Sequence, residues 1–432
     1  MSTPLRSYRD ALAALYGLVP RGIVLGLEPT REALAAHGNP QLRVPAVHVA
    51  GTNGKGSVSA MVEAGLRAAG RRIGLYTSPH LHRFVERIRV DGVPVDEAAL
   101  ESAVWRVIDE MNAGALPPLT FFEAATVVAW DVFARASLDH VVLEVGLGGR
   151  LDSTTVCAPA ITAITRIARD HEARLGNTLG EIAREKAGIL KPGVACVLGA
   201  GLRRDACTEA RDAIERVAAE VGAPLVDAPD ARVLSMDERL RARIEVDAAG
   251  GALEIELALA GGFQVENAAT AVTVLERLGV SREHIVEGLS RVVWPARLER
   301  VGSLLFDAAH NPDGASALAT AVQRLGNAPA KRALVFGASN DKDWRTMLAI
   351  LDPLAPPANR FFCAAHLRRA EEPEVLAAHV GGTACASVRE AVDAACAAVG
   401  DDGLVIVCGS IFAVAEARGY ALGIESDPLV AM

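Results

Sequence analysis

The chain has 432 residues, of which 51% are hydrophobic, 4% aromatic and 22% charged, and its formal net charge is −9. This length exceeds what one hydrophobic core supports, so we expect two or three domains, and the aliphatic composition favours α/β layers. The acidic balance gives no electrostatic footprint for DNA or RNA. The first residues lack the apolar core of a signal peptide, and no run approaches the length of about 18 apolar residues that a membrane span needs. We therefore expect a cytoplasmic protein without nucleic-acid or membrane partners.

The first predicted elements are a helix over Ser7–Tyr16 and a loop over Gly26–Arg31. The apolar run Val44–Ala50 then predicts a buried strand, and an alanine-rich helix follows a glycine-rich turn. This turn, Gly51–Ser57, reads Gly-Thr-Asn-Gly-Lys-Gly-Ser. A strand, a Gly-rich loop and a helix can wrap backbone N–H groups around phosphate, and Lys55 adds a mobile cation. The spacing departs from the standard phosphate-loop pattern, so a turn without nucleotide stays open, but we interpret the stretch as an ATP phosphate site.

A second strand is predicted over Arg72–Tyr76, and the loop after it contains two histidines. His80 and His82 are two residues apart, which leaves a metal site open. Histidines that lie in solvent on this loop are the stronger interpretation.

The next informative stretch is a strand that carries a carboxylate. A strand-turn-strand is predicted over Ile88–Val95, and helices over 96–111 and 121–136. In the strand of 139–152, Glu144 stands near the carboxyl end, where ligands of open α/β sheets bind. A carboxylate there is a natural Mg²⁺ ligand. The alternative is an ion pair between Glu144 and an arginine.

Strands and helices continue to alternate beyond this point. The strand Ala160–Ile167 runs into Asp170–His171, and a helix that contains Lys186 follows. In isolation, Lys186 would be interpreted as a solvated helix lysine. A strand over 194–200 and a helix over 203–221 complete this part.

After residue 230 the sequence predicts first a small side sheet and then a domain boundary. Alternating apolar and polar residues over 231–260 predict a small antiparallel side sheet, and a helix begins at Phe263. A boundary is expected near 293–299, which divides the chain into domains of 1–296 and 297–432. Four further strands are predicted in the second domain: Leu304–Asp307, Ala333–Ala338, Arg360–Ala365 and Leu404–Cys408.

Eight motifs occur in an order that resembles one enzyme family. They are Gly51–Ser57, Thr77–Leu81, Glu144–Asp152, Asp170–His171 with Leu175–Thr178, Glu185–Gly188, Phe263–Asn267, Pro295–Glu299 and Asp307–Pro312. In these motifs the chain resembles the folylpolyglutamate synthase/dihydrofolate synthase family, relatives of the Mur ligases, over essentially its whole length. The resemblance implies an α/β fold: an N-terminal ATPase domain of phosphate-loop type, with a mostly parallel sheet and a small antiparallel side sheet, and a C-terminal Rossmann-like domain.

The resemblance also implies roles for residues around ATP and magnesium. ATP phosphates are expected on Gly54, Lys55, Gly56 and Ser57, and further ATP contacts on Asn267, Arg297 and Asp307. The implied Mg²⁺ ligands, at two sites, are Ser78, Glu144, His171 and Lys186. Lys186 matches a lysine that is carbamylated by CO₂, and carbamylation needs a primary amine in its neutral form, which arginine cannot supply.

The implied pteroate pocket lies on the other side of the same motifs. Its residues are Gly26, Leu27, Thr120, Phe121, Phe122, Glu123, Leu151, Asp152 and Ser153. Phe122 would offer an aromatic face, and Asp152 would accept pterin N–H groups. Glutamate is expected on the C-terminal domain, near His310, which we count among the catalytic residues, and near the loop Ser339–Asp343.

Three departures from the family pattern carry expectations of their own. Ala296 and Ala308 stand where the family has glycine. If these positions need positive φ, alanine costs on the order of 1 kcal/mol at each, which shifts a loop without abolishing a site. Glu28–Pro29 stands where an arginine is usual, so pterin contacts at that loop are the least defined.

The implied activity is ATP-dependent addition of L-glutamate to dihydropteroate and to reduced folates through an acyl phosphate, by a monomer. The catalytic residues would be Lys55, Lys186, His171 and His310. A monofunctional folylpolyglutamate synthase is the nearest alternative. A Mur-type cell-wall ligase would need an additional N-terminal domain, and a nucleotide-binding protein without chemistry would not need Lys55, Glu144, His171 and Lys186 together.

Overall fold

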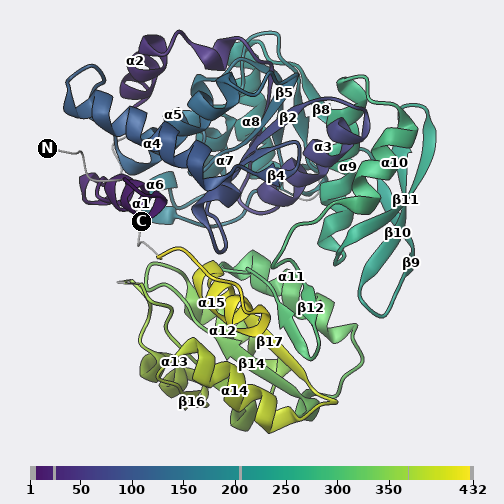
Figure 1. The fold of residues 1–432 in the computed structure, drawn as a ribbon. Coiled ribbons are helices and arrows are strands. Elements are labelled where there is room, and N and C mark those ends of the chain that lie inside the picture. The colour runs from purple at the N-terminus through teal and green to yellow at the C-terminus, as the bar shows by residue number, and fades with distance from the viewer. Residues whose placement is uncertain (1–5, 23–25, 204–206, 368, 429–432) are drawn as a thin grey trace, which may run out of the picture.

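The computed structural model describes residues 6–22, 26–203, 207–367 and 369–428, and within these ranges its strands form three sheets (Figure 1). The first sheet has the order β4-β3-β2-β5-β1-β6-β7-β8. Its strands are β1 Ala46–Ala50, β2 Ile73–Tyr76, β3 Ile88–Val90, β4 Val93–Pro94, β5 His140–Glu144, β6 Pro159–Ile164, β7 Cys196–Leu198 and β8 Leu225–Asp227. The second is an antiparallel sheet of β9 Ala231–Met236, β10 Arg241–Ala248 and β11 Gly251–Ala260.

The third sheet belongs to the C-terminal part of the chain and has the order β12-β13-β17-β14-β15-β16. Its strands are β12 Glu299–Val301, β13 Leu304–Phe306, β14 Arg332–Phe336, β15 Arg360–Phe362, β16 Thr383–Ala384 and β17 Leu404–Cys408. Strands β13 to β17 pair in parallel, and β12 is antiparallel to β13.

Helices cover the faces of these sheets. They are α1 Tyr8–Tyr16, α2 Glu28–Ala36, α3 Lys55–Ala68, α4 Glu97–Asn112, α5 Phe121–Ala134, α6 Glu172–Leu175, α7 Leu179–Ala187, α8 Thr208–Val221, α9 Phe263–Arg277, α10 Arg282–Arg291, α11 Pro312–Gln323, α12 Trp344–Leu351, α13 Pro373–Val380, α14 Val388–Val399 and α15 Ile411–Leu422. Side chains set several of the starts, because Ser7, Thr120 and Thr178 each accept the backbone N–H of the third helical residue. None of the described helices combines the length and the apolar character of a membrane span.

The order of the strands in the first sheet determines the edge at which a ligand can bind. Strands β2, β5, β1, β6, β7 and β8 run parallel, and β1 lies between β5 and β6. All five residues of β1 are buried, as a strand covered on both faces requires. The chain therefore crosses to opposite sides of β1, and the carboxyl ends of β5, β1 and β6 meet at a topological switch point, where open α/β sheets bind ligands.

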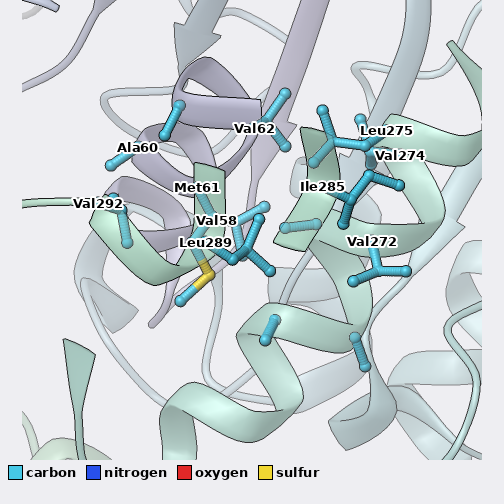
Figure 2. Packing of buried hydrophobic residues seen from close by; sticks show 14 of the residues in the cluster. Val58, Ala60, Met61, Val62, Val272, Val274, Leu275, Ile285, Leu289 and Val292 are labelled. Carbon is cyan, nitrogen blue, oxygen red and sulfur yellow. The ribbon is translucent and has the colours of Figure 1, made fainter. Parts of the chain in front are cut away.

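Helix α3, which follows β1, is held by a large apolar cluster between the first and second sheets. Figure 2 shows Val58 and Met61 of α3 beside Leu289 of α10 and Val292, which directly follows α10. Helix α9 packs against α3 as well. Burial of each such side chain contributes about 1.5–3 kcal/mol, so the start of α3 has little freedom to move alone.

The predicted element types are confirmed for the strands and helices named above, with one exception. The expected loop over Gly26–Arg31 is wrong, because α2 begins at Glu28. Pro29 is compatible with this start, since proline lacks only an N–H that the first helical turn leaves unpaired. Strands β8, β12 and β16 and helices α6 and α10 were not predicted.

The expectation that the histidines after β2 lie in solvent is also wrong. His80 is 9% exposed and His82 3% exposed. The Nε of Arg87 donates to His80 Nδ1 at 2.8 Å, and burial lowers the pKa of His80 well below its ordinary value, so this ring is a neutral acceptor. His82 lies between Arg418 and Ser426 of the C-terminal part, at 2.8 and 3.1 Å.

Residues 424–428, which we call the C-terminal strap, connect the C-terminal part of the chain to its N-terminal part. Figure 1 shows this strap leaving α15 toward α1. The carboxylate of Asp427 accepts the hydroxyl of Tyr8 at 2.6 Å and the backbone N–H of Phe84 at 2.7 Å. Its own N–H donates to the carbonyl of His82 at 2.9 Å. This C-terminal strap therefore ties the third sheet's layer to the turn that follows β2.

We predict that Asp427→Ala lowers stability by about 1–3 kcal/mol, because it leaves the half-buried donors of Tyr8 and Phe84 without an acceptor. Thermal unfolding followed by circular dichroism measures the change. The control is Glu425→Ala, which removes an exposed carboxylate from the same segment. Equal apparent melting temperatures for the two variants would contradict the assigned role of the strap.

Candidate functional site

A cavity of about 970 Å³ lies between the carboxyl ends of the first and third sheets. Its walls come from residues directly after β1, β5 and β6 on one side and after β13, β14 and β17 on the other. It contains nearly every residue predicted for the site: Gly26, Gly54, Lys55, Gly56, Ser57, Ser78, Thr120, Phe121, Phe122, Glu123, Glu144, Leu151, Asp152, Ser153, His171, Lys186, Asn267, Arg297, Asp307 and His310. Leu27 instead packs against the core beneath α5.

The glycine-rich turn has the conformation that phosphate binding needs. Gly54 precedes α3 with φ +90°, and a Cβ there would lie 2.4 Å from Oδ1 of Asn267, so no larger residue fits. Lys55 is the first helical residue, and its Nζ donates to the carbonyls of Gly51 and Thr52 at 3.1 and 3.0 Å. The free N–H groups of the first helical turn thus open into the cavity beside an ammonium group.

Lys186 is not the solvated lysine that its helix position suggested. It is 5% exposed, and its Nζ donates to the carbonyl of Gly51 at 2.8 Å, the same oxygen that Lys55 contacts. Burial and the charge of Lys55 lower the pKa of Lys186 to about 7. A substantial share of this amine is therefore neutral at physiological pH.

Glu144 is the last residue of β5 and lies at the bottom of the cavity. It is 7% exposed and accepts the backbone N–H of Ser78 at 3.2 Å. Burial raises its pKa, whereas the charge of Lys55 and, more weakly, that of Arg297 oppose the rise. In the described chain its direct partner is thus a backbone N–H, and the alternative of an arginine ion pair is not observed.

A buried carboxylate, Asp170, joins the two sides of the cavity. Lys342 donates to its Oδ1, Asn311 Nδ2 donates to its Oδ2 at 3.2 Å, and Nε2 of His310 lies 3.5 Å away. Burial by itself would raise the pKa of Asp170, but His310, Lys342 and His171 together hold that pKa well below its usual range. This carboxylate is therefore ionised, with partners from the C-terminal part on both of its oxygens.

His171 occupies the left-handed region, with φ +53°, directly after Asp170. Its Nε2 lies 3.2 Å from Nζ of Lys342. Burial lowers the pKa of His171 to about 4, although the charge of Asp170 opposes this. The ring is therefore neutral at physiological pH, as a metal ligand must be.

A second set of contacts across the cavity begins in the phosphate loop itself. Asn53 and Asn311 exchange amide hydrogen bonds at 3.1 and 3.0 Å, and Asn53 also donates to Asp313 at 2.7 Å. Arg166, after β6, donates to the same Asp313 at 2.9 Å. The phosphate loop is thus in direct contact with the start of α11.

The residues predicted for a pteroate pocket line the cavity, except Leu27, and several of their polar groups are already paired. The four acceptor positions of the Asp152 carboxylate are used by the N–H groups of Gly146, Leu147 and Thr154 and by the Thr154 hydroxyl. A bond from Asp152 to a pterin would have to replace one of these. Glu123 caps α5 by accepting the N–H and hydroxyl of Thr120.

On the opposite wall, Asp307 and Arg297 are held by the chain around Ala296. Asp307 accepts the N–H groups of Leu298 and Ala309, both at 2.9 Å. Ala296 has φ +56°, so the condition of a positive φ is met at this position, whereas it is not met at Ala308.

Sequence reasoning missed the residues that join the two walls: Asn53, Arg166, Asp170, Asn311, Asp313 and Lys342. Asn53, Asp170, Asn311 and Lys342 lie in motifs or loops that the sequence analysis already marked, so their position was available but their partners were not. Arg166 and Asp313 carried no signal, because their function depends on contacts between distant parts of the chain.

The donors at the cavity floor fit a magnesium ion. Among the described residues, no group of three or more His, Cys, Asp or Glu side chains could hold a metal by itself. Mg²⁺, however, is usually bound by one or two carboxylates together with substrate phosphates and water. The buried Glu144, next to Ser78 and facing the phosphate loop, matches that donor set.

Known proteins resemble this chain over nearly its whole length, which includes all the residues of the cavity described above. The family described as Mur ligase, glutamate ligase domain, matches residues 296–411. The dihydrofolate synthase/folylpolyglutamate synthase of Escherichia coli is 35% identical over 96% of this chain and 95% of its own length. The Bacillus subtilis protein of that name is 35% identical over 81% of this chain and 84% of its own. A probable bifunctional folylpolyglutamate synthase/dihydropteroate synthase of Haloferax volcanii is 35% identical over 95% of this chain, which spans 50% of that relative's length.

Solved structures agree with this similarity. The structure of Escherichia coli FolC in complex with DHPP and ADP has a TM-score of 0.86 and 32% identity, covering 98% of this chain and 99% of that chain. Folylpolyglutamate synthase of Mycobacterium tuberculosis, complexed with ADP and AMPPCP, has a TM-score of 0.85 and 30% identity, covering 95% and 99%. The chain therefore belongs to the folylpolyglutamate synthase/dihydrofolate synthase family within the Mur ligase superfamily.

Proposed function

We propose that the protein is an ATP-dependent ligase that adds L-glutamate to dihydropteroate, which gives dihydrofolate, and to the glutamate tail of reduced folates. The observation that carries this proposal is one cavity in which the start of α3, Lys55, Glu144 and the neutral amine of Lys186 meet. The relatives solved in complex with ADP, which for the Escherichia coli protein includes DHPP as well, support a nucleotide and a pteroate-type substrate here.

The first chemical step needs a site that gathers negative charge. A carboxylate oxygen of the pteroate or folate attacks the γ-phosphorus of ATP, the bond to ADP breaks, and an acyl phosphate forms. Lys55 and the N–H groups at the start of α3 stabilise the charge on the transferred phosphoryl group. Ser78, Glu144, His171 and a carbamate on Lys186 would hold Mg²⁺, which would offset the charge between the carboxylate and the triphosphate.

In the second step the neutral amine of glutamate attacks the acyl carbon, phosphate leaves, and the amine loses a proton. The C-terminal part supplies Lys342 and His310 at the edge of the cavity, where the carboxylates of an amino acid would find cationic and N–H donors. We propose that the chain divides between residues 296 and 297, and that these two domains close over ATP to exclude water from the acyl phosphate. We also propose that the protein is a monomer and acts in the cytoplasm.

A monofunctional folylpolyglutamate synthase remains the second candidate. The relative from Lacticaseibacillus casei carries that name, at 34% identity over 73% of this chain. The bifunctional enzyme is favoured by the relatives from Escherichia coli and Bacillus subtilis, which carry the double name over 96% and 81% of this chain. Phe122, at the start of α5, would face the pteroyl rings in either enzyme.

With dihydropteroate, glutamate and Mg-ATP, we expect dihydrofolate together with stoichiometric phosphate, and tail extension with tetrahydrofolate. Chromatography of the folates and a phosphate assay measure both. If phosphate is released with tetrahydrofolate but not with dihydropteroate, only the monofunctional enzyme fits.

We also predict that Lys55→Ala reduces turnover by about two orders of magnitude or more, because it removes the cation at the transferred phosphoryl group. Lys331→Ala, at an exposed position, is the control.

We predict a carbamate on Lys186, since its amine is buried, partly neutral and next to a cation that would pair with the new carboxylate. Carbon-13 NMR with labelled bicarbonate should show a carbamate signal that acid removes. Lys186→Arg should be nearly inactive because arginine cannot form it, whereas Lys191→Arg should keep both signal and activity. A carbamate signal that survives in Lys186→Arg would contradict the assignment.

In buffers free of CO₂, the same amine should make stability depend on pH. Its pKa is about 7 in the folded protein and about 10.5 in the unfolded chain, so between these values the unfolded state binds more protons. The free energy of unfolding should therefore rise with pH across this window, relative to Lys186→Met. Urea unfolding at pH 7 and pH 9 tests this, with the exposed Lys331→Met as the control. Parallel pH dependence in wild type and Lys186→Met would refute the shift.

A further inference from the structure

The linker between the first and third sheets carries a tryptophan that lies against the phosphate loop. Trp294 follows α10, and a Cβ placed on Gly56 would lie 2.9 to 3.2 Å from three atoms of its indole ring. Gly56 is the second residue of α3, between Lys55 and Ser57. The indole ring therefore rests on the backbone that would hold the ATP phosphates, in the space that any side chain at Gly56 would need.

The indole ring is fixed on the phosphate-loop side by two further contacts. The guanidinium of Arg89 lies 5.1 Å from its ring centroid, a cation–π geometry. The ring also packs against the apolar cluster that joins α3 and α10, to which Val58 and Val292 in Figure 2 belong. Trp294 is thus part of the same rigid layer as the start of α3.

The next residues of the linker are fixed to the other side of the cavity. The N–H of Ala296 donates to Glu299 at 2.8 Å, and its carbonyl accepts the N–H of Ala308 at 3.0 Å. Arg418 of α15 makes two 2.8 Å bonds with the same Glu299. Everything from Ala296 onward therefore moves with the third sheet.

A single residue, Pro295, separates these two anchored segments, and its ring fixes φ. Arg297 follows two residues later and lines the cavity. A displacement of the third sheet is consequently passed to Trp294, and a displacement of the phosphate loop is passed to Arg297. The linker acts as a short stiff connection, not as a flexible tether.

We propose that Trp294 is a positioning residue that couples the phosphate loop to Arg297, so that nucleotide binding and closure of the cavity depend on the indole ring at Gly56. This inference rests on the proposed function only in taking ATP as the ligand. The ring does not line the cavity, so its effect on ATP passes through Gly56 and Arg297.

The test measures ATP binding directly and does not require turnover. By equilibrium dialysis with Mg-ATP, Trp294→Ala should weaken binding about tenfold, and Trp294→Phe, which keeps a ring on Gly56, should stay within about threefold of wild type. In steady-state assays the KM for ATP should rise in Trp294→Ala, while the KM for glutamate changes much less. Unchanged ATP affinity in Trp294→Ala would overturn the proposal.

Tryptophan emission gives a second measurement that a merely structural role would not change. Nucleotide should alter the emission of the wild-type protein, and the change should vanish in Trp294→Phe. It should persist in the control Trp105→Phe, because Trp105 stacks on Arg6 away from the cavity. A nucleotide-dependent change that survives in Trp294→Phe counts against the proposal even if Trp294→Ala does not fold. Absence of ATP binding by the wild-type protein would instead refute the proposed function.

Discussion

Two lysine amines share one carbonyl oxygen at the centre of this protein, and the site is organised around that crowding. Both Lys55 and Lys186 donate to the carbonyl of Gly51; Lys186 is buried and Lys55 is half-buried. Two full positive charges this close, in a medium that screens poorly, would repel strongly. The lowered pKa of Lys186 reduces that cost, because a substantial share of its amine is uncharged, and the uncharged amine could react with CO₂ while Lys55 supplies a cation for phosphate.

The negative charges of the cavity follow from the same constraint. The charge of Lys55 opposes the rise that burial causes in the pKa of Glu144. The charge of Asp170 stabilises the ammonium form of both lysines. Asp170 is also the point at which Lys342, His310 and Asn311 meet the first sheet's side of the cavity. The closed arrangement of the two sides therefore depends on an ionised carboxylate that is itself part of the charge balance.

Local signals made much of this predictable, and distant contacts explain what was missed. The phosphate loop and the carboxylate at the end of β5 follow from a few neighbouring residues. The burial of Lys186 depends on a carbonyl 135 residues away, and that of His82 on Arg418, 336 residues away. Pattern and propensity describe one element at a time, so an exposed lysine or histidine was the natural expectation for each.

The same reasoning explains why the linker was recognised only as a boundary. A tryptophan before a proline has no helical or strand period, and its role appears only when α3 is packed beside α10. This packing gives a second explanation, besides phosphate binding, for a glycine at position 56. The missing side chain of Gly56 makes room for the indole ring as well as for a ligand. Because Ala296 adopts φ +56° two residues later, at a cost of about 1 kcal/mol, the linker stores strain where Arg297 must be aimed. A stiff connection can carry that strain, and it ties the placement of Arg297 to the loop that holds the phosphates.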